Sequence, residues 1–160
     1  MIDTELAALA ATVLAENRAA GRLIATAESC TGGLVAAALT EIAGSSDVVD
    51  RGFVTYSNDA KMDMLGVPAD VLAAHGAVSE PTALAMATGA LAHSRAAVTV
   101  AITGIAGPGG ATPGKPVGTV VFACAIKGGA ATAYTRQFPD MVRADVRRQA
   151  ALFALELLRP

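Results

Sequence analysis

The chain has 160 residues, of which 53% are hydrophobic and 16% charged, a composition that excludes a disordered protein. The formal net charge is -2, and the densest basic group (Arg143, Arg147 and Arg148) is too small for a nucleic-acid footprint. No apolar run is long enough to span a membrane, and the amino terminus is acidic, whereas a secretory signal begins with basic residues. We therefore expect one cytoplasmic domain over residues 1–160, with no nucleic-acid or membrane partner and with both cysteines reduced.

Helical and extended patterns alternate along the first hundred residues. Apolar residues at helical spacing predict a first helix, capped by Asp3 or Thr4 and ended by Gly21. Asn58 is the expected cap of a short helix that carries Lys61, and Ser79 is the expected cap of a longer one that ends near Ser94. The other predicted elements are a strand at 22–27, a helix at 34–42, a strand at 48–57, a helix at 69–76 and a strand at 96–104.

The last third of the chain predicts a hairpin and a closing helix. A glycine-rich loop at 104–116 precedes two apolar stretches within 117–138, separated by a turn at 127–129. Four apolar residues then place an amphipathic helix on the sheet: Val142, Val146, Phe153 and Leu157. Together these elements predict an α/β protein, a single three-layer α/β/α domain with a mixed, mainly parallel sheet. Ligands of such sheets bind beyond the carboxyl ends of the parallel strands.

The segment "TAESCTGG" (26–33) follows the first predicted strand and carries a candidate nucleophile, Ser29. At a helix start, free backbone N–H groups would stabilise negative charge developing on a substrate oxygen. The same letters are also typical of a simple helix cap, with Ser29 or Thr31 as the capping residue. Cys30 competes as a nucleophile but is more typical of packing, and Glu28 is typical of a residue that anchors neighbouring loops.

A serine nucleophile needs a base, and neither histidine of the chain follows a strand. His75 and His93 both lie where a helix is expected to end. Lys61 instead follows the second strand, five residues after Tyr56. The pattern therefore indicates a Ser-Tyr-Lys relay, in which burial or a neighbouring cation lowers the pKa of Lys61 so that the pair can take a proton from Ser29.

The stretch "TGIAGPGG" (103–110) lacks the Gly-Lys-Ser/Thr ending of a phosphate-binding P-loop. Successive glycines after a strand can nevertheless form an anion-binding nest, and Lys115 could contact a phosphate or project into water. Cys124 lies within a predicted strand and is expected in the core. No motif is typical of carboxylate metal ligation, so we expect neither a metal nor a cofactor.

Four long motifs of this chain resemble the CinA carboxy-terminal domain family, the nicotinamide-nucleotide amidohydrolases. They are "TAESCTGG" (26–33), "GFVTYSNDAK" (52–61), "LGVPADVLAAHGAVSEP" (65–81) and "TGIAGPGGATPGKPVGTV" (103–120). The match runs in order from about residue 5 to the last helix. It implies hydrolysis of nicotinamide mononucleotide (NMN) to nicotinate mononucleotide and ammonia, within bacterial pyridine nucleotide recycling.

The resemblance implies a role for each matching residue. Ser29 is the nucleophile, and Tyr56 and Lys61 are its activating partners. The implied substrate-binding residues are Cys30, Thr31, Gly32, Gly33, Thr103, Gly104, Ile105, Ala106, Gly107, Gly110 and Arg143. The family's Gly-Asp-Arg run is replaced by "FPDMVRADVRR" (138–148), so Arg143 keeps the arginine position without the Gly-Asp pair.

The family domain often follows a larger amino-terminal domain, and this chain resembles the stand-alone form. We also expect a homo-oligomer, because the predicted hairpin leaves a sheet edge to cover. Two other functions are compatible with the same residues. One is a non-catalytic nucleotide-binding regulatory module, and the other is an amidase or esterase that acts on another small substrate.

Overall fold

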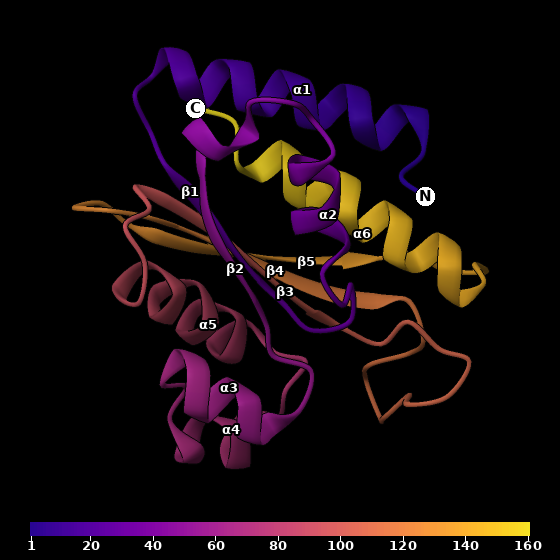
Figure 1. The fold of residues 1–160 in the computed structure, drawn as a ribbon. Coiled ribbons are helices and arrows are strands. Elements are labelled where there is room, and N and C mark those ends of the chain that lie inside the picture. Colours follow the sequence, from indigo (N-terminus) through magenta and orange to yellow (C-terminus); the bar gives the residue numbers. More distant parts are fainter.

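A five-stranded mixed sheet forms the centre of the computed structural model, which describes all 160 residues (Figure 1). Its strand order is β2-β1-β3-β4-β5. β1 pairs in parallel with both β2 and β3, whereas β4 pairs antiparallel with β3 and β5. The strands are β1 (Ile24–Glu28), β2 (Val49–Val54), β3 (Val98–Gly104), β4 (Thr119–Ile126) and β5 (Ala131–Gln137). The predicted α/β sheet, with its parallel strands and closing hairpin, is confirmed.

Helices cover both faces of this sheet (Figure 1). One face is covered by α1 (Thr4–Ala19), α2 (Leu34–Thr40) and α6 (Arg143–Leu157). The other face is covered by α3 (Asn58–Leu65), α4 (Ala69–His75) and α5 (Glu80–Ala92). The apolar core is correspondingly divided into two clusters, one on each face of the sheet. None of the helices combines the length and apolar character needed to cross a lipid bilayer.

Glycine allows the close approach of α3 to α5. A Cβ at Gly89 would collide with the carbonyl group of Leu65, the last residue of α3. Leu65 itself is buried in the core cluster of this face. The absence of a side chain at Gly89 therefore permits the observed position of the helix that carries Lys61.

Three local predictions were wrong by a few residues. Ser57, not Asn58, caps α3, because Ser57 has extended backbone and its hydroxyl accepts the N–H of Ala60 at 3.0 Å. β2 ends at Val54, since the chain already turns toward α3. Val142 does not lie on the sheet; it precedes α6 and is 68% exposed.

The chain leaves β1 and β2 toward opposite faces of the sheet. The segment after β1 leads to α2, and the segment after β2 leads to α3 on the other side (Figure 1). Adjacent parallel strands whose connections diverge in this way leave a crevice beyond their carboxyl ends.

At the opposite edge of the sheet, β5 is mostly exposed. The homo-oligomer expected from this edge stays a prediction.

Candidate active site

Ser29 and Lys61 meet in the crevice between β1 and β2. The Lys61 Nζ lies 2.8 Å from the Ser29 Oγ and 2.8 Å from the carbonyl oxygen of Thr55. The carbonyl oxygen of Tyr56 lies 3.4 Å from both the Lys61 Nζ and the Ser29 Oγ. A neutral amine has two N–H donors and one lone pair. The two carbonyls can therefore take the donors, which leaves the lone pair for the hydroxyl proton of Ser29.

Lys61 is buried, and the burial changes its acidity. Lys61 is only 1% exposed, and no carboxylate forms an ion pair with it. Loss of water disfavours the ammonium form, so the pKa of Lys61 is lowered from its ordinary value of 10.5 to about 8. The crevice therefore contains an amine that can act as a base near neutral pH.

The nucleophile loop, residues 29–33, does not form the helix start expected for it. α2 begins only at Leu34, and Gly32 and Gly33 adopt positive φ values of 59° and 103°. The N–H of Gly32 donates to the carbonyl of Ser29 at 3.0 Å, so this donor is already occupied. The N–H groups of Cys30 and Thr31, in contrast, make no hydrogen bond with another residue. The N–H group of Gly33 also has no partner, but those of Cys30 and Thr31 directly follow Ser29 in the chain, so we consider these two as the donors for a developing oxyanion.

Glu28 anchors this loop, as expected from the sequence. Its carboxylate accepts the Thr31 hydroxyl at 2.6 Å and the N–H groups of Val35 and Ala36 at 2.9 and 3.0 Å. A carboxylate that receives the first N–H groups of a helix is stabilised by the helix dipole. Glu28 is fully buried, and its hydrogen bonds to Thr31 and to the first turn of α2 connect the loop to this helix.

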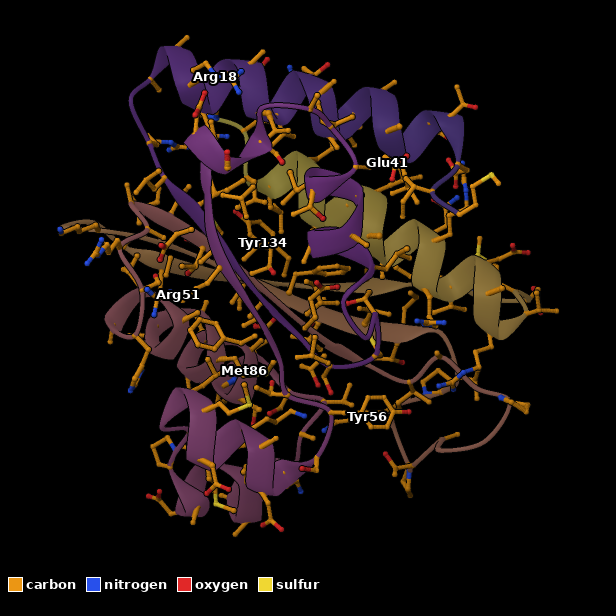
Figure 2. All side chains as sticks on the ribbon, in the orientation of Figure 1. Arg18, Glu41, Arg51, Tyr56, Met86 and Tyr134 are labelled. Atoms are coloured by element: carbon orange, nitrogen blue, oxygen red, sulfur yellow. The ribbon has the colours of Figure 1, made fainter.

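The Tyr56 side chain lies at the mouth of the crevice rather than against Ser29. Figure 2 shows it directed away from α3 toward the loop that follows β3. Its hydroxyl lies 3.2 Å from the Arg143 Nη2, and the residue is 64% exposed. The expected relay through the phenol therefore has no contact to Ser29 or Lys61, whereas the Tyr56 backbone carbonyl contacts both.

The glycine-rich loop between β3 and β4 lies beside the same crevice. The Arg143 Nη1 donates to the carbonyl of Gly107 at 2.8 Å. Gly107 has a φ of 84°, which favours glycine, and a Cβ at this position would collide with Val117. Both the backbone conformation and the nearby Val117 side chain therefore require glycine at position 107. The Thr103 hydroxyl donates to the carbonyl of Ala77 at 2.8 Å and thereby joins β3 to the segment between α4 and α5.

These groups line a cavity of about 260 Å³. Most of the predicted site residues reach it, together with two that sequence reasoning missed, Ala77 and Val78. The full lining is Ser29, Cys30, Tyr56, Lys61, Ala77, Val78, Thr103, Gly104, Ala106 and Arg143. No carboxylate is among them, and Arg143 gives the cavity a positive charge.

Six predicted binding residues lie outside the cavity lining, and four of them belong to the loops around it. Thr31, Gly32 and Gly33 form the loop behind Ser29. Gly107 reaches the cavity only through its contact with Arg143.

Two other predicted residues line a neighbouring hollow of about 160 Å³, which adjoins the cavity through Ala77 and Val78. They are Ile105 and Gly110, and Lys115 lines the same hollow. The Lys115 Nζ donates to the carbonyl of His75 at 3.2 Å, so the side chain ties the glycine-rich loop to the end of α4.

The competing nucleophile and bases are not placed for catalysis. Burial raises the pKa of the Cys30 thiol to about 12, which keeps it protonated. His75 ends α4, and His93 follows α5 with its Nδ1 2.8 Å from the carbonyl of Gly89. Cys124 is half-buried at the edge of the core.

Sequence reasoning did not single out Arg147 as part of the site. Its Nε and Nη2 each lie 3.1 Å from a backbone carbonyl of the nucleophile loop, those of Cys30 and Thr31. The one available signal is its spacing, since residues four apart share a helix face and Arg143 precedes it by four. That signal alone does not indicate which element the face contacts.

Comparisons with known proteins found a matching family and similar sequences. The family model described as the CinA C-terminal domain matches residues 6–160. A nicotinamide-nucleotide amidohydrolase PncC from Escherichia coli K12 is 51% identical over 158 residues, which cover 99% of this chain and 95% of that protein. A CinA-like protein from Mycolicibacterium gilvum is 56% identical over 159 residues, and the chain spans only 35% of its length.

A solved structure has the same fold. The competence/damage inducible protein CihA from Agrobacterium tumefaciens superposes with a TM-score of 0.95. It is 51% identical in sequence, and the match covers 99% of this chain and 96% of that one.

Proposed function

The chain belongs to the CinA C-terminal domain family, and from that premise we propose that it hydrolyses the carboxamide of NMN to nicotinate mononucleotide and ammonia. The relative named for this type of reaction matches along nearly its whole length. In the longer CinA-like relatives, the part that does not match this chain is about twice as long as the part that does. The proposed activity does not include any function of that additional part. The observation that carries the proposal is the 2.8 Å contact between the Ser29 Oγ and the Nζ of a buried lysine.

Lys61 is the general base in this mechanism. Its neutral amine takes the proton from Ser29 as the Oγ attacks the carboxamide carbon, and the carbonyl π electrons move to the oxygen. The oxyanion accepts hydrogen bonds from the Cys30 and Thr31 N–H groups. Lys61 then returns the proton to the nitrogen, the C–N bond breaks, and ammonia leaves. Water attacks the resulting acyl-enzyme with Lys61 again as base, which releases the carboxylate and restores Ser29.

Tyr56 contributes to activation through its backbone and to binding through its side chain. Its carbonyl receives an N–H of Lys61 and so helps to orient the lone pair toward Ser29. Its phenol ring at the mouth of the cavity offers a face to the positively charged pyridinium ring of NMN. Arg143 holds the phenol and supplies the charge that attracts the substrate phosphate.

Ammonia release from NMN by the purified protein tests this function. We expect Ser29→Ala and Lys61→Met each to lower kcat by about 10⁴-fold, while NMN binding, measured by calorimetry, stays detectable. Lys127→Met is the matched control, because Lys127 is exposed in the turn between β4 and β5. In the wild type, kcat should rise with pH and level off above about 8, since only neutral Lys61 accepts a proton.

The other functions predict different results. A wild-type protein that binds NMN but releases no ammonia would be a nucleotide-binding module. Faster turnover of a small ester or of another amide than of NMN would identify a different substrate. Unchanged turnover in both Ser29→Ala and Lys61→Met would remove the covalent mechanism.

A further inference from the structure

Arg147 forms hydrogen bonds with the backbone of the nucleophile loop and no ion pair with a carboxylate. Its guanidinium donates to the carbonyls of Cys30 and Thr31, and no carboxylate lies within 4.0 Å of it. Arg148, the next residue on α6, instead pairs with Asp3 and Glu5. Arg147 is half-buried, and its hydrogen-bond partners are two carbonyls of one loop. Partial removal of a charged group from water costs free energy, so this arrangement indicates that the charge has a role in the loop.

The connectivity of the peptide groups shows where that charge is felt. The Cys30 carbonyl shares its peptide group with the Thr31 N–H, so the guanidinium polarises this donor directly. The Thr31 carbonyl shares its peptide group with the Gly32 N–H, which donates to the Ser29 carbonyl at 3.0 Å. The Ser29 carbonyl in turn shares its peptide group with the Cys30 N–H. Hydrogen bonds in such a chain strengthen one another.

The Cys30 and Thr31 N–H groups therefore each lie at the end of a path from Arg147. The path to Thr31 passes through one peptide group, and the path to Cys30 passes through two groups joined by the Gly32 hydrogen bond. The same contacts hold the orientation of the Thr31–Gly32 peptide group, to which Gly32 would otherwise give greater freedom of rotation.

We propose that Arg147 is a positioning residue for the oxyanion site: its guanidinium fixes and polarises the peptide groups that present the Cys30 and Thr31 N–H donors. The role rests on the proposed function, in which those donors receive the oxyanion. Arg147 does not line the cavity, so it affects the substrate only through the loop. Its effect is therefore on the transition state and not on substrate binding.

The geometry requires arginine rather than any cation. The Nε and Nη2 contact two successive carbonyls, each at 3.1 Å, which a planar fork can do and a single ammonium cannot do equally well. The loop also approaches closely, since a Cβ at Gly32 would lie 3.4 Å from the Arg147 Nη2.

The kinetic test compares Arg147→Gln, Arg147→Lys and the control Arg148→Gln, all assayed for ammonia release from NMN per folded protein. We expect Arg147→Gln to lower kcat by about ten- to a hundredfold, less than the loss of an oxyanion donor itself, with KM within about twofold. Arg147→Lys should recover part of the loss, and Arg148→Gln should keep the wild-type kcat. The rise of kcat near pH 8 should persist in Arg147→Gln, because Lys61 is untouched. A wild-type kcat in Arg147→Gln, or a loss confined to KM, would overturn the proposal.

A second measurement needs no substrate and separates this proposal from the proposed function. Amide hydrogen exchange followed by mass spectrometry should show faster exchange within 29–33 in Arg147→Gln, because the Gly32 hydrogen bond loosens, with no change there in Arg148→Gln. Unchanged exchange in Arg147→Gln would refute the positioning role. A wild-type protein that releases no ammonia would refute the proposed function instead, while the exchange result would still report on the loop.

Discussion

Replacing Lys61 with methionine should remove a specific part of the pH dependence of stability. The side chain is buried, and its pKa is lowered from 10.5 to about 8 because the ammonium form loses its hydration. Between these two values the unfolded chain binds more protons at this lysine than the folded protein does. The free energy of unfolding of the wild type therefore rises with pH across this window, and the penalty for burying the amine is complete below pH 8.

The magnitude follows from the two pKa values. Linkage gives a gain of about 2.5 kcal/mol in the wild-type free energy of unfolding between pH 7 and pH 10 from this one group. Methionine has a similar length and no titrating atom, so Lys61→Met should lack that gain. The hydrogen bonds lost to Ser29 and Thr55 shift the stability of the variant at every pH and do not alter the slope.

Urea unfolding at equilibrium, measured at pH 7, 8, 9 and 10, tests this expectation. The quantity to compare is the wild-type free energy of unfolding minus that of Lys61→Met, because titrations common to both proteins cancel. Lys127→Met, which replaces a lysine at an exposed turn position, is the matched control. A difference for Lys61→Met that stays constant within about 0.5 kcal/mol would show that the folded protein leaves this amine hydrated, and the reasoning about the base would fail.

Three further predictions concern the surroundings of the site. Glu28→Ala should lower the free energy of unfolding by about 3 kcal/mol in urea titrations, because the Thr31 hydroxyl and two N–H groups of α2 lose their acceptor; a loss below about 1 kcal/mol would contradict this. Gly107→Ala should cost about 2–3 kcal/mol by thermal unfolding, since its φ is positive and its Cβ meets Val117. Gly109→Ala, with open space around it, should change little, and equal effects at the two glycines would refute the steric argument. Arg143→Met should raise KM for NMN about tenfold while leaving KM for the riboside without phosphate nearly unchanged, as steady-state ammonia assays can show; an equal rise for both substrates would exclude phosphate recognition by this arginine.

Much of the architecture followed from local patterns in the chain. Apolar spacing, capping residues and glycines are properties of neighbouring residues, so they predicted the alternation of helices and strands and a cap at Asp3 or Thr4, of which Asp3 is the cap observed. Where two local signals competed, the prediction failed by a few residues. Ser57 and Asn58 are both good caps, and the choice between them depended on where β2 turns toward α3.

The candidate site divides in the same way. The sequence indicated Ser29 as a candidate nucleophile and Tyr56 with Lys61 as the pair that takes its proton, because these residues follow strands whose carboxyl ends meet at one edge of the sheet. Only the tertiary structure could decide the 2.8 Å separation of the Ser29 Oγ and the Lys61 Nζ, and the contact of the Tyr56 hydroxyl with Arg143. The same is true of the hydrogen bonds from Arg147 to Cys30 and Thr31, which lie more than a hundred positions away in the chain. The physical reason is that side-chain direction and loss of hydration depend on what packs around a residue, and those neighbours come from distant parts of the chain.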